Sequence, residues 1–404
     1  MSPRALELLD LAFRWVHVIA GVMWIGNSLL FNWLDRNLRP SSRGGEGVYG
    51  DIWLLHSGAF YFVEKTALVG QPLPRPLHWF KWQAYTTWLS GAALLVAVYY
   101  AGGRALLVDP AVADLSPGAA TAVAVGAIVG AWIVYDLLWR VVAPRSAVAA
   151  AALSVAALVG LVVALTSLLS GRAAFLHVGA ALGTIMAANV GHTIMPSQRA
   201  LVAGVEGGRP DPALAARAKT RSIHNNYLTF PVIVLMVSSH FPGLYGHPRS
   251  WIALLVLIAT GATVRHLLNV RNTFTRWVPA LGATVAASLA ALWLAGRPAR
   301  PAPTNVARAD APVVAAHEAT FSAVRPIIDR RCAACHSQNP AIADFGPAPG
   351  GAAFDTPEQM RAFAPRIRVR TVDTRTMPPA NRTHVTDRER AILGAWVDQG
   401  APIR

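Results

Sequence analysis

Eight apolar stretches occupy the first three quarters of this chain, and each is long enough to cross a lipid bilayer. In hydrocarbon every backbone N–H and C=O must be satisfied within the protein, so such stretches fold only as helices or as a closed barrel. Runs of about twenty apolar residues favour helices. We therefore expect an all-α, polytopic membrane helix bundle with spans near 8–33, 82–102, 119–139, 146–170, 173–196, 225–241, 251–270 and 277–296.

The composition agrees with this class. The chain is 54% hydrophobic and only 14% charged, whereas a soluble domain carries about 25% charged residues. The first apolar stretch has no basic leading segment and no small-residue cleavage site, so we expect it to remain as a span. The second and sixth spans each open after a histidine, His78 and His224, with Tyr85 and Tyr227 just inside. This similarity hints at two duplicated four-helix halves.

The distribution of lysine and arginine predicts the orientation. The odd-numbered connections between spans hold most of these residues, and the even-numbered ones hold about one each. Basic loops stay in the cytoplasm, so both chain termini are expected on the outer side of a bacterial inner membrane. The net charge of +15 then describes a belt at the cytoplasmic face. No nucleic-acid-binding motif is present, and we expect no nucleic-acid partner.

The C-terminal quarter carries the sequence Cys332-Ala333-Ala334-Cys335-His336. C-x-x-C-H is the attachment signature of haem c, in which both cysteines bind the porphyrin and the histidine binds the iron. The protein contains only these 2 cysteines, which leaves none for a zinc site or a further disulfide. Met377, in a proline-bounded loop, is the predicted second axial ligand. Met360 is the alternative, but it lies in a helix-like run where methionine more often fills a core.

These features divide the chain into three parts. Residues 1–296 form the predicted eight-span domain, 297–315 a linker rich in proline and alanine, and 316–404 a small all-α cytochrome c domain. Residues 321–331 are predicted as the helix leading into the attachment site. A capping-box pattern from Thr386 to Glu389 predicts the start of a last helix.

Two histidines lie inside predicted spans, where polar side chains are costly. His17 and His177 are at similar depth near the outer ends of the first and fifth spans. They could ligate a haem b between them. The alternative is that each makes a hydrogen bond between helices. The predicted metal ligands are thus His336 and Met377 for haem c, with His17 and His177 for a haem b.

A second polar group lies at the predicted cytoplasmic ends of four spans. Its amides, imidazoles and one guanidinium could line a pocket for a small, planar, polar or anionic molecule. The alternative is helix capping and snorkelling at the interface. The apolar segment around His56 is expected to lie on the membrane or to cover the bundle. The group comprises Asn27, Asn189, His192, His224, Asn225, Asn226, Tyr227, Arg265, His266 and Asn269.

Several motifs together resemble one protein family. They are Trp33-Leu-Asp-Arg36, His56-Ser-Gly-Ala-Phe-Tyr61, Leu77-His-Trp-Phe-Lys-Trp82, Asn189-Val-Gly-His-Thr-Ile-Met-Pro196 and the C-terminal haem motif with Met377-Pro-Pro379. With these motifs the chain resembles the bacterial membrane-bound urate hydroxylases of the PuuD type, which fuse an eight-helix membrane domain to a C-terminal cytochrome c. A fainter likeness of His17-x6-Trp24-x-Gly26 to four-helix haem-binding membrane proteins bears on the haem b hypothesis.

The resemblance implies oxidation of urate to 5-hydroxyisourate, with the new oxygen taken from water. Electrons would leave through haem c to a cytochrome c oxidase or a soluble cytochrome. Two alternatives stay open: a cytochrome subunit relaying electrons from quinol or a partner dehydrogenase, and a transporter with a tethered cytochrome. The candidate urate-binding residues are Asn27, Asn189, Asn225 and Arg265. The candidate catalytic bases are His56, His192, His224 and His266.

Overall fold

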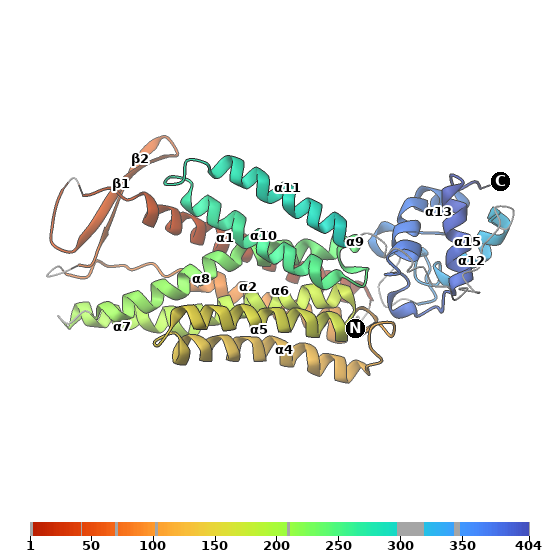
Figure 1. Cartoon of the computed structure of the whole chain (residues 1–404), viewed down its shortest axis with the longest axis horizontal. Helices are drawn as coiled ribbons and strands as arrows, with labels where there is room; N and C mark the ends of the chain where they lie inside the picture. The colour runs from red at the N-terminus through yellow and green to blue at the C-terminus, as the bar shows by residue number, and fades with distance from the viewer. Residues whose placement is uncertain are drawn as a thin grey trace.

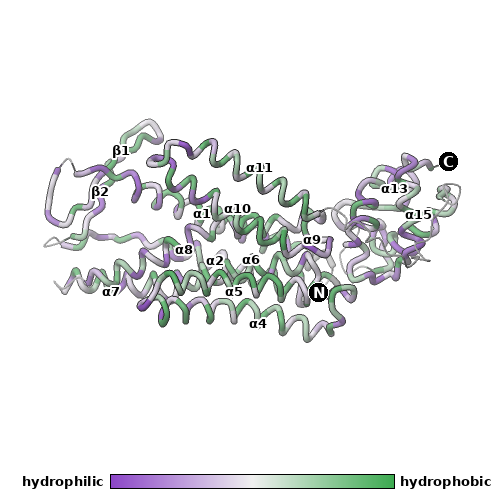
Figure 2. The backbone as a smooth tube through the Cα atoms, in the orientation of Figure 1, coloured by the Kyte–Doolittle hydropathy of each residue, from purple (hydrophilic) through white to green (hydrophobic). Residues whose placement is uncertain are grey.

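The computed structural model describes residues 3–41, 43–68, 72–101, 104–207, 211–296, 319–342 and 348–403. Long helices run roughly side by side in one bundle, and a small helical domain lies at one end (Figure 1). The N-terminal end of the first helix lies at the same end as the small domain. Apolar residues follow the helices of the bundle, while polar residues gather at its far end and in the small domain (Figure 2).

The membrane bundle contains all eight predicted spans as helices. In chain order they lie in α1 (Pro3–Asn37), α2 (Lys81–Leu95) with the π-helical turn η1 (Val96–Ala101), α4 (Pro117–Leu137) with η2 (Leu138–Val142), α5 (Ala147–Leu168), α6 (Gly171–Ala188) with η3 (Asn189–Ile194), α8 (Pro212–Val237), α10 (Ser250–Val270) and α11 (Trp277–Ala295). In the described part of the chain, six helices are long and apolar enough to cross a membrane. The other two, α2 and α8, pack within the same bundle. The chain is therefore a multi-pass membrane protein.

Two predicted spans are longer than expected. The fifth continues through η3 into α7 (Met195–Glu206), and the sixth begins at Pro212, well before the predicted start at 225. Hydropathy marks only the lipid-compatible part of a helix, so polar extensions beyond the bilayer escape it. Shorter elements join the spans: α3 (Arg104–Leu107) before α4, then η4 (Ser238–His240) and α9 (Pro242–Tyr245) before α10.

Helix α6 is the centre of the bundle. It packs against α2, α4, α5 and α8, so helices of both predicted halves share one core. Small residues allow this close approach, as expected in membranes, where packing replaces the hydrophobic effect. A Cβ on Gly179 would lie 3.0 Å from the Cβ of Leu235 in α8. Pro231 lies inside α8, and Gly261 of α10 packs directly against it. A Cβ on Gly261 would lie 2.7 Å from the Pro231 nitrogen, so only glycine fits there.

The segment around His56 differs from the expectation. Instead of an apolar stretch lying flat, β1 (Val48–His56) and β2 (Ala59–Thr66) form an antiparallel hairpin beyond the end of α1. Ser57 and Gly58 make the two-residue turn, both with positive φ (52° and 76°), as tight hairpins require. Aromatic and β-branched residues on both sides of a Ser-Gly turn are the strand signal in this sequence.

The C-terminal domain has its own core around Trp396, Leu393, Ile328 and Met360, all less than 1% exposed. Helix α12 (Phe321–Arg331) leads to the cysteines, as predicted. It is followed by the short turn Pro349–Gly351, α13 (Pro357–Ala362), α14 (Ala364–Ile367), η7 (Arg368–Asp373), η8 (Pro379–Asn381) and α15 (Asp387–Asp398). The predicted capping box of Thr386 and Glu389 opens α15. The predicted linker 297–315 lies outside the described residues.

Candidate functional site

The C-x-x-C-H motif, Cys332–His336, forms a compact turn at the end of α12. The backbone N–H groups of Cys335 and His336 both donate to the carbonyl of Cys332, at 3.1 and 2.8 Å. Both cysteines are free of disulfides. Burial raises the pKa of the Cys332 thiol to about 12, and Cys335 acts in the same direction. Nδ1 of His336 lies 3.0 Å from the carbonyl oxygen of Ala352. This contact fixes the ring and leaves Nε2 to bind iron, the arrangement typical of a ligating histidine.

The loop of Met377 is held by backbone contacts. Its N–H donates to Arg370 O of η7 at 2.9 Å. Its carbonyl accepts from Arg390 Nη1 at 3.1 Å, and the same nitrogen also donates to Thr371 O. Met360, by contrast, is completely buried in the core of the domain. Cys332, Cys335, His336 and Met377 thus fit a haem c in donor type, with Met377 partly exposed and Met360 occupied by packing.

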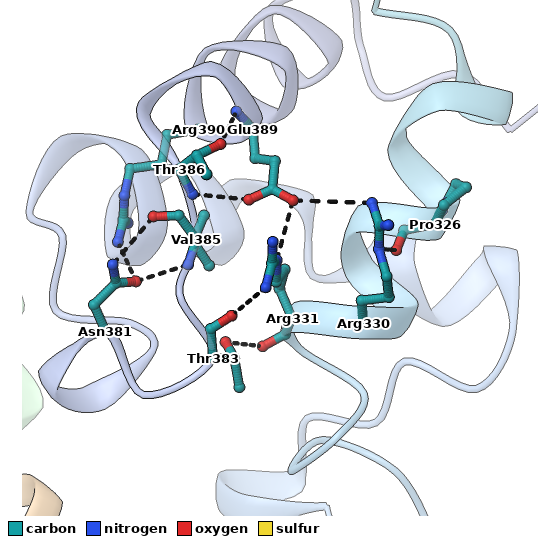
Figure 3. Close-up of polar contacts among 9 residues, drawn as sticks. All are labelled: Pro326, Arg330, Arg331, Asn381, Thr383, Val385, Thr386, Glu389 and Arg390. Atoms are coloured by element: carbon teal, nitrogen blue, oxygen red, sulfur yellow. Dashed lines mark hydrogen bonds and ion pairs between the residues drawn. The ribbon is translucent and has the colours of Figure 1, made fainter.

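A charged network joins the two ends of this domain (Figure 3). Glu389, at the start of α15, accepts from Arg331 Nε of α12 at 3.0 Å and from the Thr386 N–H at 2.8 Å. Arg331 also donates to Thr383 O at 2.6 Å. Burial raises the pKa of Glu389, but the hydrogen bonds from Thr386 and Arg331 outweigh it and hold that pKa below its usual range. The network keeps α12 and α15 together around the attachment turn.

His17 and His177 are each bound to neighbouring protein groups. Nδ1 of His17 lies 2.9 Å from Thr87 O and 3.2 Å from Ser90 Oγ, both in α2. His177 is fully buried, with Nδ1 2.7 Å from Ala173 O and Nε2 2.9 Å from Tyr100 Oη of η1. Both imidazoles make contacts between helices, on different turns of α2 and η1. Both ring nitrogens of His177 thus contact protein groups, and the haem b stays a prediction.

Helix α8 divides the predicted polar group. Successive residues of a helix point about 100° apart, so Asn225 and Asn226 face different neighbours. On one side Asn225 Oδ1 accepts from Asn189 at 2.9 Å. Asn189 also donates to Tyr135 Oη at 3.1 Å, which lies 2.7 Å from His224 Nδ1. Buried Arg221 pairs with Asp136 at 3.2 Å beside this network.

On the other side of α8 lies a cavity of about 360 Å³ between α1, α8 and α10. Arg265 Nε donates to Asn226 Oδ1 at 3.1 Å, and Nη2 donates to Asn32 Oδ1 at 3.3 Å. Asn226 Oδ1 also accepts from Asn269 at 2.8 Å. The remaining side-chain groups, Asn226 Nδ2 and Asn269 Oδ1, are buried and have no partner. The lining comprises Leu29, Leu30, Asn32, Trp33, Arg36, Asn37, Phe230, Arg265, Leu268, Asn269, Arg271 and Asn272.

The charge of this cavity is unbalanced. Its lining has three arginines and no carboxylate, and Arg265 is 6% exposed. A buried cation without an opposite charge is costly in a membrane protein. Four asparagines supply amide donors and acceptors, while Trp33 and Phe230 supply aromatic faces. The arrangement suits a flat anion edged with amide-like groups.

The other predicted site residues lie elsewhere. Asn27 donates to Gln83 of α2 at 2.9 Å. His192 is exposed and stacks on Trp132. His266 is exposed and lies 2.8 Å from Tyr227 Oη. His56 is exposed beside the hairpin turn. None of the four predicted bases lines the Arg265 cavity. Among the described residues, no three His, Cys, Asp or Glu side chains gather as a metal-ion site.

Sequence reasoning missed several residues of this cavity. Asn32, Arg36 and Asn37 come from the end of α1, and Arg271 and Asn272 from the turn after α10. These two segments are more than two hundred residues apart in the chain, so only the fold joins them. A signal was nevertheless present: in a helix Asn32 and Arg36 are four residues apart and share a face.

Fold and cavity define a multi-pass helical membrane protein with a cationic pocket at one end of its bundle and a small helical domain at the other. Within this class, the chain belongs to the family described as urate oxidase N-terminal, whose family model matches residues 3–295. The match ends with α11, so the membrane bundle is the part of the chain that the family model covers. No curated protein and no solved structure matches the chain.

Proposed function

We propose that this protein oxidises urate in its membrane bundle, with the Arg265 cavity as the binding site. The observation that carries the proposal is the excess of three arginines over carboxylates in a cavity also lined by amides. Urate is a flat anion whose edges carry amide-like donors and acceptors. Arg265, Arg36 and Arg271 would balance its charge, and the unpartnered Oδ1 of the lining residue Asn269 would accept from one of its N–H groups.

The reaction would be hydroxylation by water: urate and water give 5-hydroxyisourate, two electrons and two protons. The chain's own residues would bind and orient urate, and the apolar walls of the cavity would limit the access of water. Cys332, Cys335, His336 and Met377 would hold a haem c in the C-terminal domain. When bound, it would supply a one-electron acceptor and a link to an external oxidant, such as a cytochrome c oxidase or soluble cytochrome.

The general base remains open among His56, His192, His224 and His266. None of them lines the cavity. His224 is the candidate held in a buried hydrogen-bond network: its Nδ1 lies 2.7 Å from Tyr135 Oη, which accepts from Asn189. That network lies on the side of α8 away from the cavity.

Anaerobic mixing of the purified, haem-loaded protein with urate tests the proposal. We expect the ferrous absorption band of haem c to rise in proportion to the urate consumed, with no peroxide formed when an oxidase regenerates the ferric protein. Reduction by a quinol with no response to urate would instead identify a cytochrome subunit that relays electrons. A silent spectrum with urate uptake into vesicles would indicate a transporter.

A further inference from the structure

The C-terminal domain contacts the bundle through the two segments that flank Met377. Segment η7, which precedes Met377, lies against α9, and η8, which follows it, lies against α3. Thr374 connects the first contact to the ligand loop, because its Oγ1 lies 3.0 Å from Thr376 Oγ1, next to Met377. The domain therefore presents its methionine side to the membrane part.

The contact at α9 is close enough to require glycine. A Cβ placed on Gly246 would lie 2.4 Å from Thr374 Cβ and 3.0 Å from the Thr374 carbonyl oxygen. Real side chains do not approach so closely, so any other residue here would push the two parts from each other. Gly243, one turn earlier on the same helix, has nothing within 4 Å of its Cβ position.

One turn of the bundle holds both contact elements. Ser170, before α6, donates its Oγ to Leu106 O at 2.6 Å and its N–H to Leu107 O at 3.0 Å, which fixes α3. The adjacent Gly171 lies under the backbone of α9: a Cβ there would be 2.1 Å from Tyr245 O. Helices α3 and α9 are thus rigidly mounted on α6, the central helix of the bundle.

Charge supports the same orientation. Arg390 is 6% exposed and binds the Met377 loop, yet its hydrogen-bond acceptors are neutral. Burial lowers its pKa and Arg375 adds to this, while Asp387 and, from the bundle, Asp109 act in the opposite direction. Asp109 follows α3, the helix that η8 contacts, so its negative charge lies on the bundle's side of that contact.

We infer that α3 and α9, mounted on the Ser170–Gly171 turn, are a docking seat that fixes the Met377 side of the C-terminal domain for electron transfer from the bundle. The inference rests on the proposed function for its electron donor, urate. Two transfers oxidise one urate, and each moves one electron and no atoms. The substrate that is being oxidised in the bundle loses the electron, and ferric haem c gains it; the external oxidant regenerates ferric haem c between transfers. Docking replaces a diffusional encounter of the C-terminal domain by a fixed position at its end of the bundle.

The test compares Gly246→Val with Gly243→Val in the full-length, haem-loaded protein. We expect Gly246→Val to increase hydrogen exchange in α9 and η7 and to slow haem reduction by urate about tenfold, as expected if the docked population falls to roughly a tenth. Direct reduction by dithionite and the haem reduction potential should stay unchanged. Gly243→Val should behave as wild type in all four measurements.

A second variant avoids any steric effect. Asp109→Asn keeps the oxygen that accepts from Ala111 N–H at 3.0 Å but removes the negative charge next to α3, the helix that η8 contacts. We expect slower reduction by urate and faster exchange in η8, with haem potential unaltered. Equal exchange and equal reduction rates in Gly246→Val and Gly243→Val would overturn the docking seat. If wild type ignores urate while Gly246→Val still loosens α9 and η7, the urate assignment fails and the docked orientation stands.

Discussion

At the scale of single residues, Arg265 has the most to explain. It is the buried member of a cationic set without a carboxylate, and its two neutral partners, Asn226 and Asn32, cannot balance its charge. Such a group is costly to keep unless an anion completes it. Substitution of Arg265 is therefore the most direct test of the proposed urate site.

Replacing Arg265 by glutamine should weaken urate binding by about 2 kcal/mol or more, roughly thirtyfold, because a buried charge-assisted contact is lost. Calorimetric titration of the purified protein with urate measures this. Arg276→Gln is the matched control, an exposed arginine at the same end of the bundle and outside the cavity lining. Equal affinities in the two variants would place urate elsewhere.

Arg390 is a positioning residue for Met377. Its guanidinium binds Thr371 O, Met377 O and Asn381 Oδ1, so it joins the segments on both sides of the ligand loop. Arg390→Leu should release the loop and so weaken the binding of Met377 to the proposed haem c, since buried hydrogen bonds to a charged group contribute about 1.5–3 kcal/mol each.

The expected readouts for Arg390→Leu are loss of the far-red absorption band of methionine-ligated ferric haem and a lower reduction potential. Arg361→Leu, on the exposed face of α13, is the control. An unaltered band and potential in Arg390→Leu would show that Met377 is held without this side chain.

Much of this residue-scale chemistry was predictable from sequence, but its grouping was not. The C-x-x-C-H motif does form a turn at the end of α12, while the haem c and its ligand Met377 stay predictions. The polar group of four spans was predicted as one pocket, and α8 divides it, because Asn225 and Asn226 cannot face the same way. The arginines of α1 and α10 meet only through long-range packing, which periodicity does not report.

At the scale of elements, the clamp between α12 and α15 predicts acid sensitivity. The pKa of Glu389 is depressed in the folded protein, so the carboxylate contributes stability that is present above its unfolded pKa, about 4.3. That contribution is lost as the pH falls through the lower folded pKa. The protection of the α15 amides against hydrogen exchange, taken relative to their intrinsic exchange rates at each pH, should therefore fall below about pH 4.3 in the full-length protein.

Glu389→Gln isolates the charge, because glutamine at this position also completes a capping box. The variant should exchange faster than wild type at neutral pH, and the difference should shrink as the pH falls. Glu358→Gln, in the exposed first turn of α13, is the control. If the difference in exchange between Glu389→Gln and wild type stayed constant across the pH range, the effect would come from side-chain packing and not from the charge of Glu389.

Element prediction succeeded where period and caps agree and failed where they conflict. Helix α12 has the predicted bounds, and the predicted capping box of Thr386 and Glu389 marks the start of α15. The hairpin was missed because β1 and β2 contain consecutive apolar residues, without the alternation typical of a half-buried strand. Pro231 made the sixth span look weak, yet Gly261 supplies the space that it needs.

At the scale of the whole molecule, the placement of the histidines predicts haem content. His17 Nδ1 contacts α2, and both ring nitrogens of His177 contact protein groups, Ala173 O and Tyr100 Oη. We expect one haem per chain, all of it covalent, measured by pyridine haemochrome analysis before and after acid–acetone extraction. A second, extractable haem lost on His177→Ala would support the haem b.

The Arg265 cavity and the C-terminal domain lie at opposite ends of the bundle, and this separation has an electrical consequence. In the orientation that the basic loops predict, the cationic end faces the cytoplasm. Electrons released there would cross the bilayer to the outer side, which is the positive side of an energised membrane. Each crossing would release about 2.3 kcal/mol per 100 mV of membrane potential. Turnover in sealed vesicles would then accelerate with voltage, and the protein would act as a small load on the proton-motive force.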